Sequence, residues 1–167
     1  MKRIAVYPGS FDPVTKGHMD IIKRSKELFH NLKIGILINS SKNSWFTTEE
    51  RVKMVQMCME EVGIEAEVMT FRGLLVDFMK NQEADILVRG LRAVSDYEYE
   101  LQFTLTNTLL TERDFETIFL TASREFLYLS SSLVKEIAIN KGNLAKFVPN
   151  SIVDLIEKRA EEISNKK

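Results

Sequence analysis

The chain has 167 residues, a length that suits one domain, and its 23 Lys and Arg nearly balance its 24 Asp and Glu. This balance argues against a general polyanion binder, which carries an excess of basic residues, so we expect no nucleic-acid partner. A single cysteine, Cys58, excludes an internal disulfide, and its place between Val55 and Met59 predicts a buried, inert thiol.

The amino-terminal apolar stretch ends at Pro8, which is too short for the apolar core of a signal peptide. No later segment approaches the roughly 18 apolar residues that a membrane span requires. We therefore expect a cytoplasmic protein with no membrane partner.

Short apolar and β-branched runs along the chain predict five strands. They are Ile4–Tyr7, Lys33–Ile38, Ala66–Phe71, Ala84–Val88 and Glu116–Leu120. The segments between and after them have helical spacing. The first predicted helix starts near Gly17 and the second starts at Thr47. The next two cover Leu74–Met79 and Asp96–Leu110. The fifth ends at Ile139 after a serine cap, and the last follows Pro149.

Two features sharpen this assignment. Thr47 and Glu50 have the spacing of a capping box, in which each side chain accepts a hydrogen bond from the other residue's backbone N–H. Strands separated by helices predict parallel βαβ crossovers. We therefore expect an α/β fold with a Rossmann-like, doubly wound, five-stranded parallel sheet, in a single domain over residues 1–167.

The first predicted strand leads into Gly9-Ser10-Phe11-Asp12-Pro13, and Thr15-Lys16-Gly17-His18 opens the next helix. The start of a helix presents unpaired N–H groups and the positive end of the helix dipole, which suits a phosphate. His18 stands at that end, where it can donate a hydrogen bond to an oxygen that gains negative charge. A tight turn with a solvent-facing histidine is the simpler alternative, but the whole stretch favours a phosphate site.

Other phosphate and metal motifs are missing from the sequence. There is no Gly-x-x-x-x-Gly-Lys-Ser/Thr and no Gly-x-Gly-x-x-Gly after a strand, which disfavours a P-loop enzyme and a dinucleotide dehydrogenase. No Cys/His cluster has zinc spacing. The second histidine, His30, is predicted to be a surface or capping residue at the end of the first helix.

Three cations follow predicted strands. Lys42 comes after the second strand and, taken alone, is an ordinary loop lysine. Arg89 and Arg92 flank Gly90 after the fourth strand, where two arginines form a plausible clamp for a phosphate. Solvated charge at the start of a helix is the alternative interpretation of this pair.

A run of three serines precedes the helix that ends at Ile139. Serines cap helices routinely, and the same geometry leaves hydroxyl groups that can face a nucleotide phosphate. The preceding segment Phe126–Leu129 can flank a purine ring or belong to the core.

The stretch from Tyr7 to His18 resembles the signature of the nucleotidyltransferase superfamily with an HxGH-type motif. Its Thr-x-Gly-His form, the segment Val88–Glu100 and the serine region are similar to three motifs of the phosphopantetheine adenylyltransferase family. The resemblance covers essentially the whole chain, with mild departures: Ser10 stands where threonine is frequent, and Phe126 where tryptophan can occur.

The resemblance implies roles for individual positions. In that family the positions matching Lys42 and Arg89 hold the acceptor's phosphate, and the position matching Leu75, which otherwise reads as core, borders the pantetheine arm. The positions implied to contact ATP are Ser10, Phe11, His18, Gly90, Leu91, Arg92, Glu100, Phe126, Leu127, Tyr128, Leu129, Ser130, Ser131 and Ser132. The family resemblance also implies Mg²⁺ on the triphosphate, a homohexamer and feedback by CoA.

The expected reaction is ATP plus 4′-phosphopantetheine giving dephospho-CoA and pyrophosphate. The acceptor phosphate is already an anion, so the reaction needs alignment and charge neutralisation rather than a general base. We expect His18, Lys42, Arg89 and Ser10 to carry the catalysis. Two alternatives stay open: a sister enzyme for nicotinate mononucleotide or glycerol 3-phosphate, and a non-catalytic adenine-nucleotide or CoA sensor.

Overall fold

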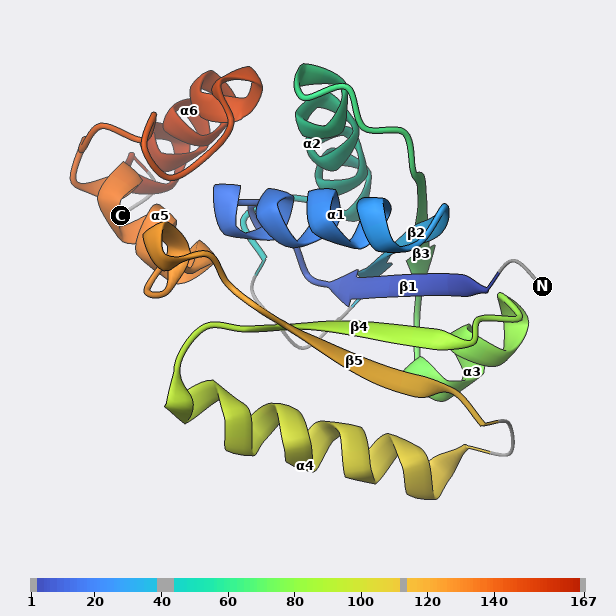
Figure 1. Ribbon diagram of the computed structural model, residues 1–167. Coiled ribbons are helices and arrows are strands. Elements are labelled where there is room, and N and C mark those ends of the chain that lie inside the picture. The colour runs from blue at the N-terminus through green and yellow to red at the C-terminus, as the bar shows by residue number, and fades with distance from the viewer. Residues whose placement is uncertain (1–2, 39–43, 112–113, 166–167) are drawn as a thin grey trace.

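The computed structural model describes residues 3–38, 44–111 and 114–165. Its centre is a parallel sheet whose strands lie in the order β3-β2-β1-β4-β5 (Figure 1). The strands are β1 (Ile4–Gly9), β2 (Asn31–Leu37), β3 (Glu67–Phe71), β4 (Ile86–Leu91) and β5 (Glu116–Thr121). The five-stranded, doubly wound parallel sheet predicted from the sequence is therefore confirmed.

Helices cover both faces of the sheet (Figure 1). One face carries α1 (Lys16–Leu28), α2 (Thr48–Glu61), α5 (Ser131–Ile139) and α6 (Val153–Ser164), and the other carries α3 (Leu75–Asn81) and α4 (Val94–Leu110). Two short 3₁₀ turns, η1 (Arg124–Phe126) and η2 (Asn150–Ile152), lead into α5 and α6. Among the described residues, no helix combines the length and the apolar composition needed to cross a bilayer.

The core divides into two apolar clusters because successive side chains of a strand point to opposite faces. In β1, Ala5 and Tyr7 pack toward α1 and α2, whereas Val6 packs with Phe78 and Met79 of α3. β1 pairs with β2 along one edge and with β4 along the other, and helices cover both of its faces, so most of its residues are buried. A central strand of this kind gives the loops at its carboxyl end a rigid base.

The caps of the helices agree with the sequence patterns. The Thr47 hydroxyl accepts from the Glu50 N–H at 3.2 Å, and the Glu50 carboxylate accepts from the Thr47 N–H at 2.7 Å. Of the three serines, Ser130 is the N-cap of α5, since its hydroxyl accepts from the Leu133 N–H at 3.1 Å. Cys58 is buried as expected, and burial raises the pKa of its thiol to about 12.

The strand boundaries differ from the prediction by up to three residues, and the largest difference is at the end of β4. The sequence indicated that β4 ends at Val88, but the strand continues through Leu91. Arg89, Gly90 and Leu91 pair in register with residues 119–121 of β5, and this pairing keeps the backbone extended. Arg89 therefore stands on the strand itself rather than in the loop beyond it.

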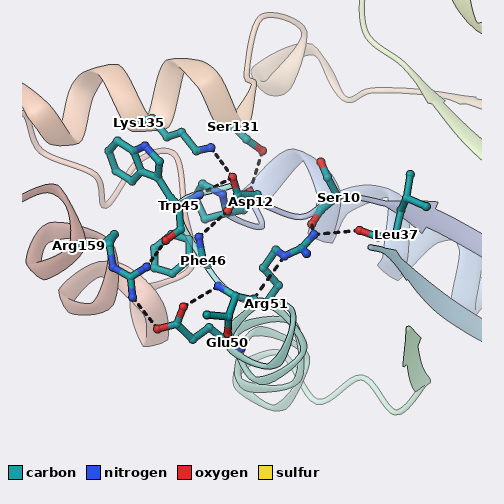
Figure 2. A network of polar contacts seen from close by, with 12 residues as sticks. Ser10, Asp12, Leu37, Trp45, Phe46, Glu50, Arg51, Ser131, Lys135 and Arg159 are labelled. Atoms are coloured by element: carbon teal, nitrogen blue, oxygen red, sulfur yellow. Dashed lines mark hydrogen bonds and ion pairs between the residues drawn. The ribbon is translucent and has the colours of Figure 1, made fainter. Parts of the chain in front are cut away.

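A polar network anchors the loop that follows β1 (Figure 2). The carboxylate of Asp12 is buried and accepts from the backbone N–H groups of Trp45 and Phe46 at 3.1 and 2.9 Å. Lys135 of α5 forms an ion pair with the same carboxylate. Asp12 thereby joins the first loop to the segment before α2 and to α5.

Candidate nucleotide site

A cleft lies where the strand order reverses, between the carboxyl ends of β1 and β4. Open α/β sheets bind ligands at such a switch point because the loops of the two strands diverge there. The cleft has a volume of about 420 Å³. Its lining includes Ser10, His18, Arg89, Gly90, Arg92, Glu100, Phe126, Leu129, Ser130, Ser131 and Ser132, all of them predicted site residues.

A larger hollow, of about 760 Å³, lies at the opposite end of the sheet, near the first residues of β1, β2 and β3. Its polar rim mixes basic and acidic side chains, such as Lys26, Lys33, Glu60 and Glu67, and none of the predicted site residues that the structure describes borders it. The switch-point cleft is therefore the better candidate for the site, although it is the smaller of the two.

His18 is held by the cap of its own helix. Thr15 is the N-cap of α1, and His18 takes the third position of the capping box, where a Glu or Gln is usual. The Thr15 N–H donates to His18 Nδ1 at 3.0 Å, while the Thr15 hydroxyl accepts from the His18 N–H at 3.3 Å. Because Nδ1 is an acceptor, the proton of the neutral ring lies on Nε2, which remains available as a donor.

The surroundings of His18 favour the neutral ring. Burial, followed by the positive charge of Arg92, lowers the pKa of His18 to about 4. Phe11 packs edge-on against the imidazole at 5.1 Å between ring centroids, which accounts for part of that burial. At neutral pH the side chain therefore acts as an uncharged hydrogen-bond donor rather than as a cation.

The two arginines of the cleft are held in different ways. Arg89 binds both carboxylate oxygens of Glu100, from Nε at 2.5 Å and from Nη2 at 2.8 Å, and its guanidinium lies over the Phe103 ring at 4.6 Å. Arg92 donates to the Leu129 carbonyl at 3.0 Å and to the Asp96 carboxylate at 3.0 Å. An entering phosphate would meet Arg89 with its fork already occupied by Glu100.

The serine run contributes hydroxyls with different tasks. Ser130 caps α5, and the Ser131 hydroxyl donates to the Pro13 carbonyl at 2.8 Å (Figure 2). Ser132 is exposed, and no described residue forms a hydrogen bond with its hydroxyl. Ser130 and Ser131 therefore have structural roles, and the phosphate-facing interpretation of the run stays a prediction.

Several predicted site residues lie elsewhere. The side chain of Phe11 is fully buried behind the cleft, and Tyr128 is 84% exposed outside it. Leu91 and Leu127 do not border the cleft, and Leu75 packs in the core on the opposite face of the sheet. Lys42 lies outside the described residues. The predicted contacts of these residues with ligands stay predictions.

The cleft lining also contains residues that were not predicted as site residues: Tyr7, Pro8, Gly9, Thr15, Gly17, Ile21, Tyr99 and Ala122. Tyr7 is buried at the end of β1, and this burial raises the pKa of its phenol. Thr15 stands in the motif, and its three-residue spacing to His18 is the capping-box signal that could have identified it. Tyr99 is 66% exposed and lies within the segment Val88–Glu100 that resembles a family motif, but no role was predicted for it.

No described group of three His, Cys, Asp or Glu residues is placed to hold a metal ion. Glu100 is the acidic residue of the cleft lining, and it is paired with Arg89. The donors present are guanidinium, imidazole and hydroxyl groups, which suit phosphate oxygens and not a cation. The cleft residues therefore do not fit a magnesium ion that the protein itself would hold.

Comparisons with known proteins give the family of this chain independently of the site geometry. The family described as cytidylyltransferase-like matches residues 6–137. A phosphopantetheine adenylyltransferase of Lachnoclostridium phytofermentans is 52% identical over 154 residues, which cover 92% of this chain and 93% of the relative. One from Clostridium perfringens is 42% identical over 161 residues, covering 96% and 97% of the two chains.

Among solved structures, a putative nicotinate-nucleotide adenylyltransferase of Vibrio parahaemolyticus aligns with a TM-score of 0.69 at 18% identity, covering 96% of this chain and 94% of its own. The nicotinic acid mononucleotide adenylyltransferase of Plasmodium falciparum, in complex with NaAD, also has a TM-score of 0.69, at 14% identity, covering 98% and 96% of the two chains. At such low identity these structures show the shared fold. The family profile and the close relatives show more: this chain belongs to the cytidylyltransferase-like family and, within it, to the phosphopantetheine adenylyltransferases.

Proposed function

We propose that the chain transfers AMP from ATP to 4′-phosphopantetheine and releases dephospho-CoA and pyrophosphate. The observation that carries the proposal is the neutral His18 imidazole, whose Nδ1 is engaged by Thr15 and whose Nε2 is left as a donor in a cleft that also contains Arg89 and Arg92. Membership of the phosphopantetheine adenylyltransferases supplies the acceptor.

In the proposed reaction an oxygen of the acceptor phosphate attacks the α-phosphorus of ATP in line with the leaving group. The new bond joins that oxygen to the α-phosphorus, and the bond from the α-phosphorus to the oxygen bridging to the β-phosphorus breaks. The acceptor oxygen is already an anion, so no proton has to be removed from it. Catalysis then consists of alignment and stabilisation of the charge on the equatorial oxygens.

The residues of the cleft divide this work. His18 Nε2 donates to an oxygen on the α-phosphorus, assisted by the positive end of the α1 dipole. Arg89 and Lys42 hold the acceptor phosphate, and Ser10 orients it. Arg92, Gly90 and the hydroxyl of Ser132 face the nucleotide. Glu100 keeps the Arg89 fork in place until a phosphate arrives.

The magnesium ion that the family resemblance implies would enter on the triphosphate, because the described residues of the cleft offer no carboxylate cage for it. A homohexameric assembly, feedback by CoA and a cytoplasmic location complete the proposal, and they rest on the family resemblance. Light scattering tests the assembly, since a hexamer would have six times the chain mass of 19.2 kDa.

A pyrophosphate-release assay tests the function. The purified chain is supplied with ATP or CTP and with 4′-phosphopantetheine, nicotinate mononucleotide or glycerol 3-phosphate. We expect fast release only with ATP and phosphopantetheine. Release with another acceptor would favour a sister enzyme, and tight ATP binding without any release would favour a sensor.

Two variants test the proposed roles within that assay. His18→Ala should lower kcat by about 10²–10³-fold, which corresponds to roughly 3–4 kcal/mol of transition-state stabilisation. Lys42→Ala should raise the KM of the acceptor strongly, and an unchanged KM would remove Lys42 from the site. His30→Ala is the matched control, because His30 is exposed and does not border the cleft.

A further inference from the structure

Arg51 is a buried cation on α2, a helix that contributes no described residue to the cleft. It is only 4% exposed. Among the described residues, no carboxylate lies within ion-pair distance of its guanidinium. A buried charge without an ionic partner is costly, so its hydrogen bonds must offset much of that cost. The identity of its partners therefore indicates what the residue does.

The guanidinium of Arg51 joins three segments (Figure 2). Its Nη1 donates to the Ser10 carbonyl at 2.8 Å and to the Leu37 carbonyl at 3.1 Å. The remaining donors contact the start of α2, where Nη2 reaches the Thr48 hydroxyl at 3.1 Å and Nε reaches the Thr47 carbonyl at 3.4 Å. One side chain thus connects the loop after β1, the end of β2 and the first turn of α2.

The bond to Ser10 has a consequence for the cleft. Ser10 borders the cleft, whereas Arg51 lies on the side of α2, so the Ser10 carbonyl is directed toward α2. Because a trans peptide is planar, the Phe11 N–H points the opposite way, and no described residue accepts a hydrogen bond from it.

The same loop needs an anchor for a second reason. Phe11 has a φ of +48°, which is unfavourable for a residue with a side chain and costs about 1 kcal/mol or more. A backbone in this region persists only when surrounding contacts hold it. Arg51 supplies such a contact at the adjoining carbonyl.

We infer that Arg51 is a positioning residue for nucleotide binding and transfer. It fixes the Ser10–Phe11 peptide so that Ser10 meets the phosphates in a single orientation, and it makes no contact with the substrate itself. This inference rests on the proposed function of the cleft. Its effect should be seen in ATP affinity and turnover, beyond any loss of folding stability.

The test compares Arg51→Met and Arg51→Lys with the control Arg159→Met. Arg159 also anchors the start of α2, through the Trp45 carbonyl and the Glu50 carboxylate, but it forms no hydrogen bond or ion pair with a described residue of the loop after β1 (Figure 2). Thermal unfolding of each variant is measured first. ATP dissociation constants are then measured by calorimetry without any acceptor, and kcat by pyrophosphate release.

We expect Arg51→Met to raise the ATP dissociation constant about tenfold, or about 1.4 kcal/mol, and to lower kcat as well. Arg51→Lys should recover part of the ATP affinity and part of kcat. The recovery should be incomplete because one ammonium group cannot reach all four oxygens that the guanidinium of Arg51 contacts. Arg159→Met should lose stability and leave both constants within about twofold of wild type, as expected for a residue outside the loop.

Two results would overturn the inference. One is wild-type ATP affinity and kcat in the folded Arg51 variants; if Arg51→Met does not fold, Arg51→Lys alone decides. The other is an equal loss of ATP affinity in Arg159→Met, which would mean that any loosening of α2 has this effect. Failure of the proposed reaction itself would appear differently, as wild-type protein that releases no pyrophosphate, and the calorimetry would still decide the role of Arg51.

Discussion

His18 should stay uncharged over the whole pH range in which nucleotidyl transfer is measured. Its pKa is lowered to about 4 by burial and by Arg92. A ring with that pKa is about 1% protonated at pH 6, whereas an unperturbed histidine would be about three-quarters protonated there. Activity should therefore show no loss from His18 titration between pH 8 and pH 6.

The same shift predicts a pH dependence of stability. Since the folded pKa lies below the unfolded value of about 6.5, the unfolded chain takes up the His18 proton first as the pH falls. Above that value His18 is neutral in both the folded and the unfolded chain, so it does not change the free energy of unfolding. Between about pH 6.5 and pH 4 it lowers the free energy of unfolding progressively. With a shift of about 2.5 pH units at 1.36 kcal/mol each, the loss reaches at most about 3.4 kcal/mol.

Two measurements check this prediction. Urea unfolding at pH 7, 5.5 and 4.5 is compared between wild type and His18→Gln, in which the titrating group is gone; the wild type should lose about 2 kcal/mol more between pH 7 and pH 4.5. In a His30→Gln protein, where His18 is the remaining imidazole, ¹⁵N spectra should show the Nε2–H tautomer. Titration of His18 near 6.5, or a proton on Nδ1, would refute the reasoning.

Three further predictions concern the supports of the site. Glu100→Ala should cost about 2 kcal/mol by leaving the part-buried Arg89 unpaired, and added phosphate should raise the Tm of this variant more than that of wild type; equal gains would contradict it. Asp12→Ala should lower the unfolding free energy in urea by about 3 kcal/mol, because the N–H groups of Trp45 and Phe46 and the ammonium of Lys135 lose their acceptor. Met54→Ala should cost about 2–5 kcal/mol and leave kcat of the folded protein unchanged; a changed kcat would link the α2 core to catalysis.

Much of the fold was predictable because its signals are local. Apolar runs marked the five strands, and the alternation with helices gave the parallel sheet. The capping box at Thr47 was confirmed because both of its bonds depend on residues within one turn. The end of β4 was not predictable in this way, because the pairing of Arg89–Leu91 with β5 depends on a strand far along the chain.

The residues of the site were likewise predictable only where their signals are local in the sequence. Residues inside recognisable motifs, such as His18 and Arg89, do border one cleft. The pairing of Arg89 with Glu100 and the anchoring by Arg51 could not be predicted, since a buried arginine on a helix resembles any surface arginine in the sequence. The role of such a residue depends on carbonyl groups that are distant in the sequence and that the tertiary structure brings close. For Arg51 these groups are 14 and 41 positions away.

The most direct test of the central claim is a crystal structure of the chain with a non-hydrolysable ATP analogue and 4′-phosphopantetheine. We predict that an oxygen of the α-phosphate lies within hydrogen-bond distance of His18 Nε2, about 3 Å, in the cleft between β1 and β4. An analogue bound instead in the hollow at the opposite end of the sheet, or one whose α-phosphate is far from His18, would contradict the account.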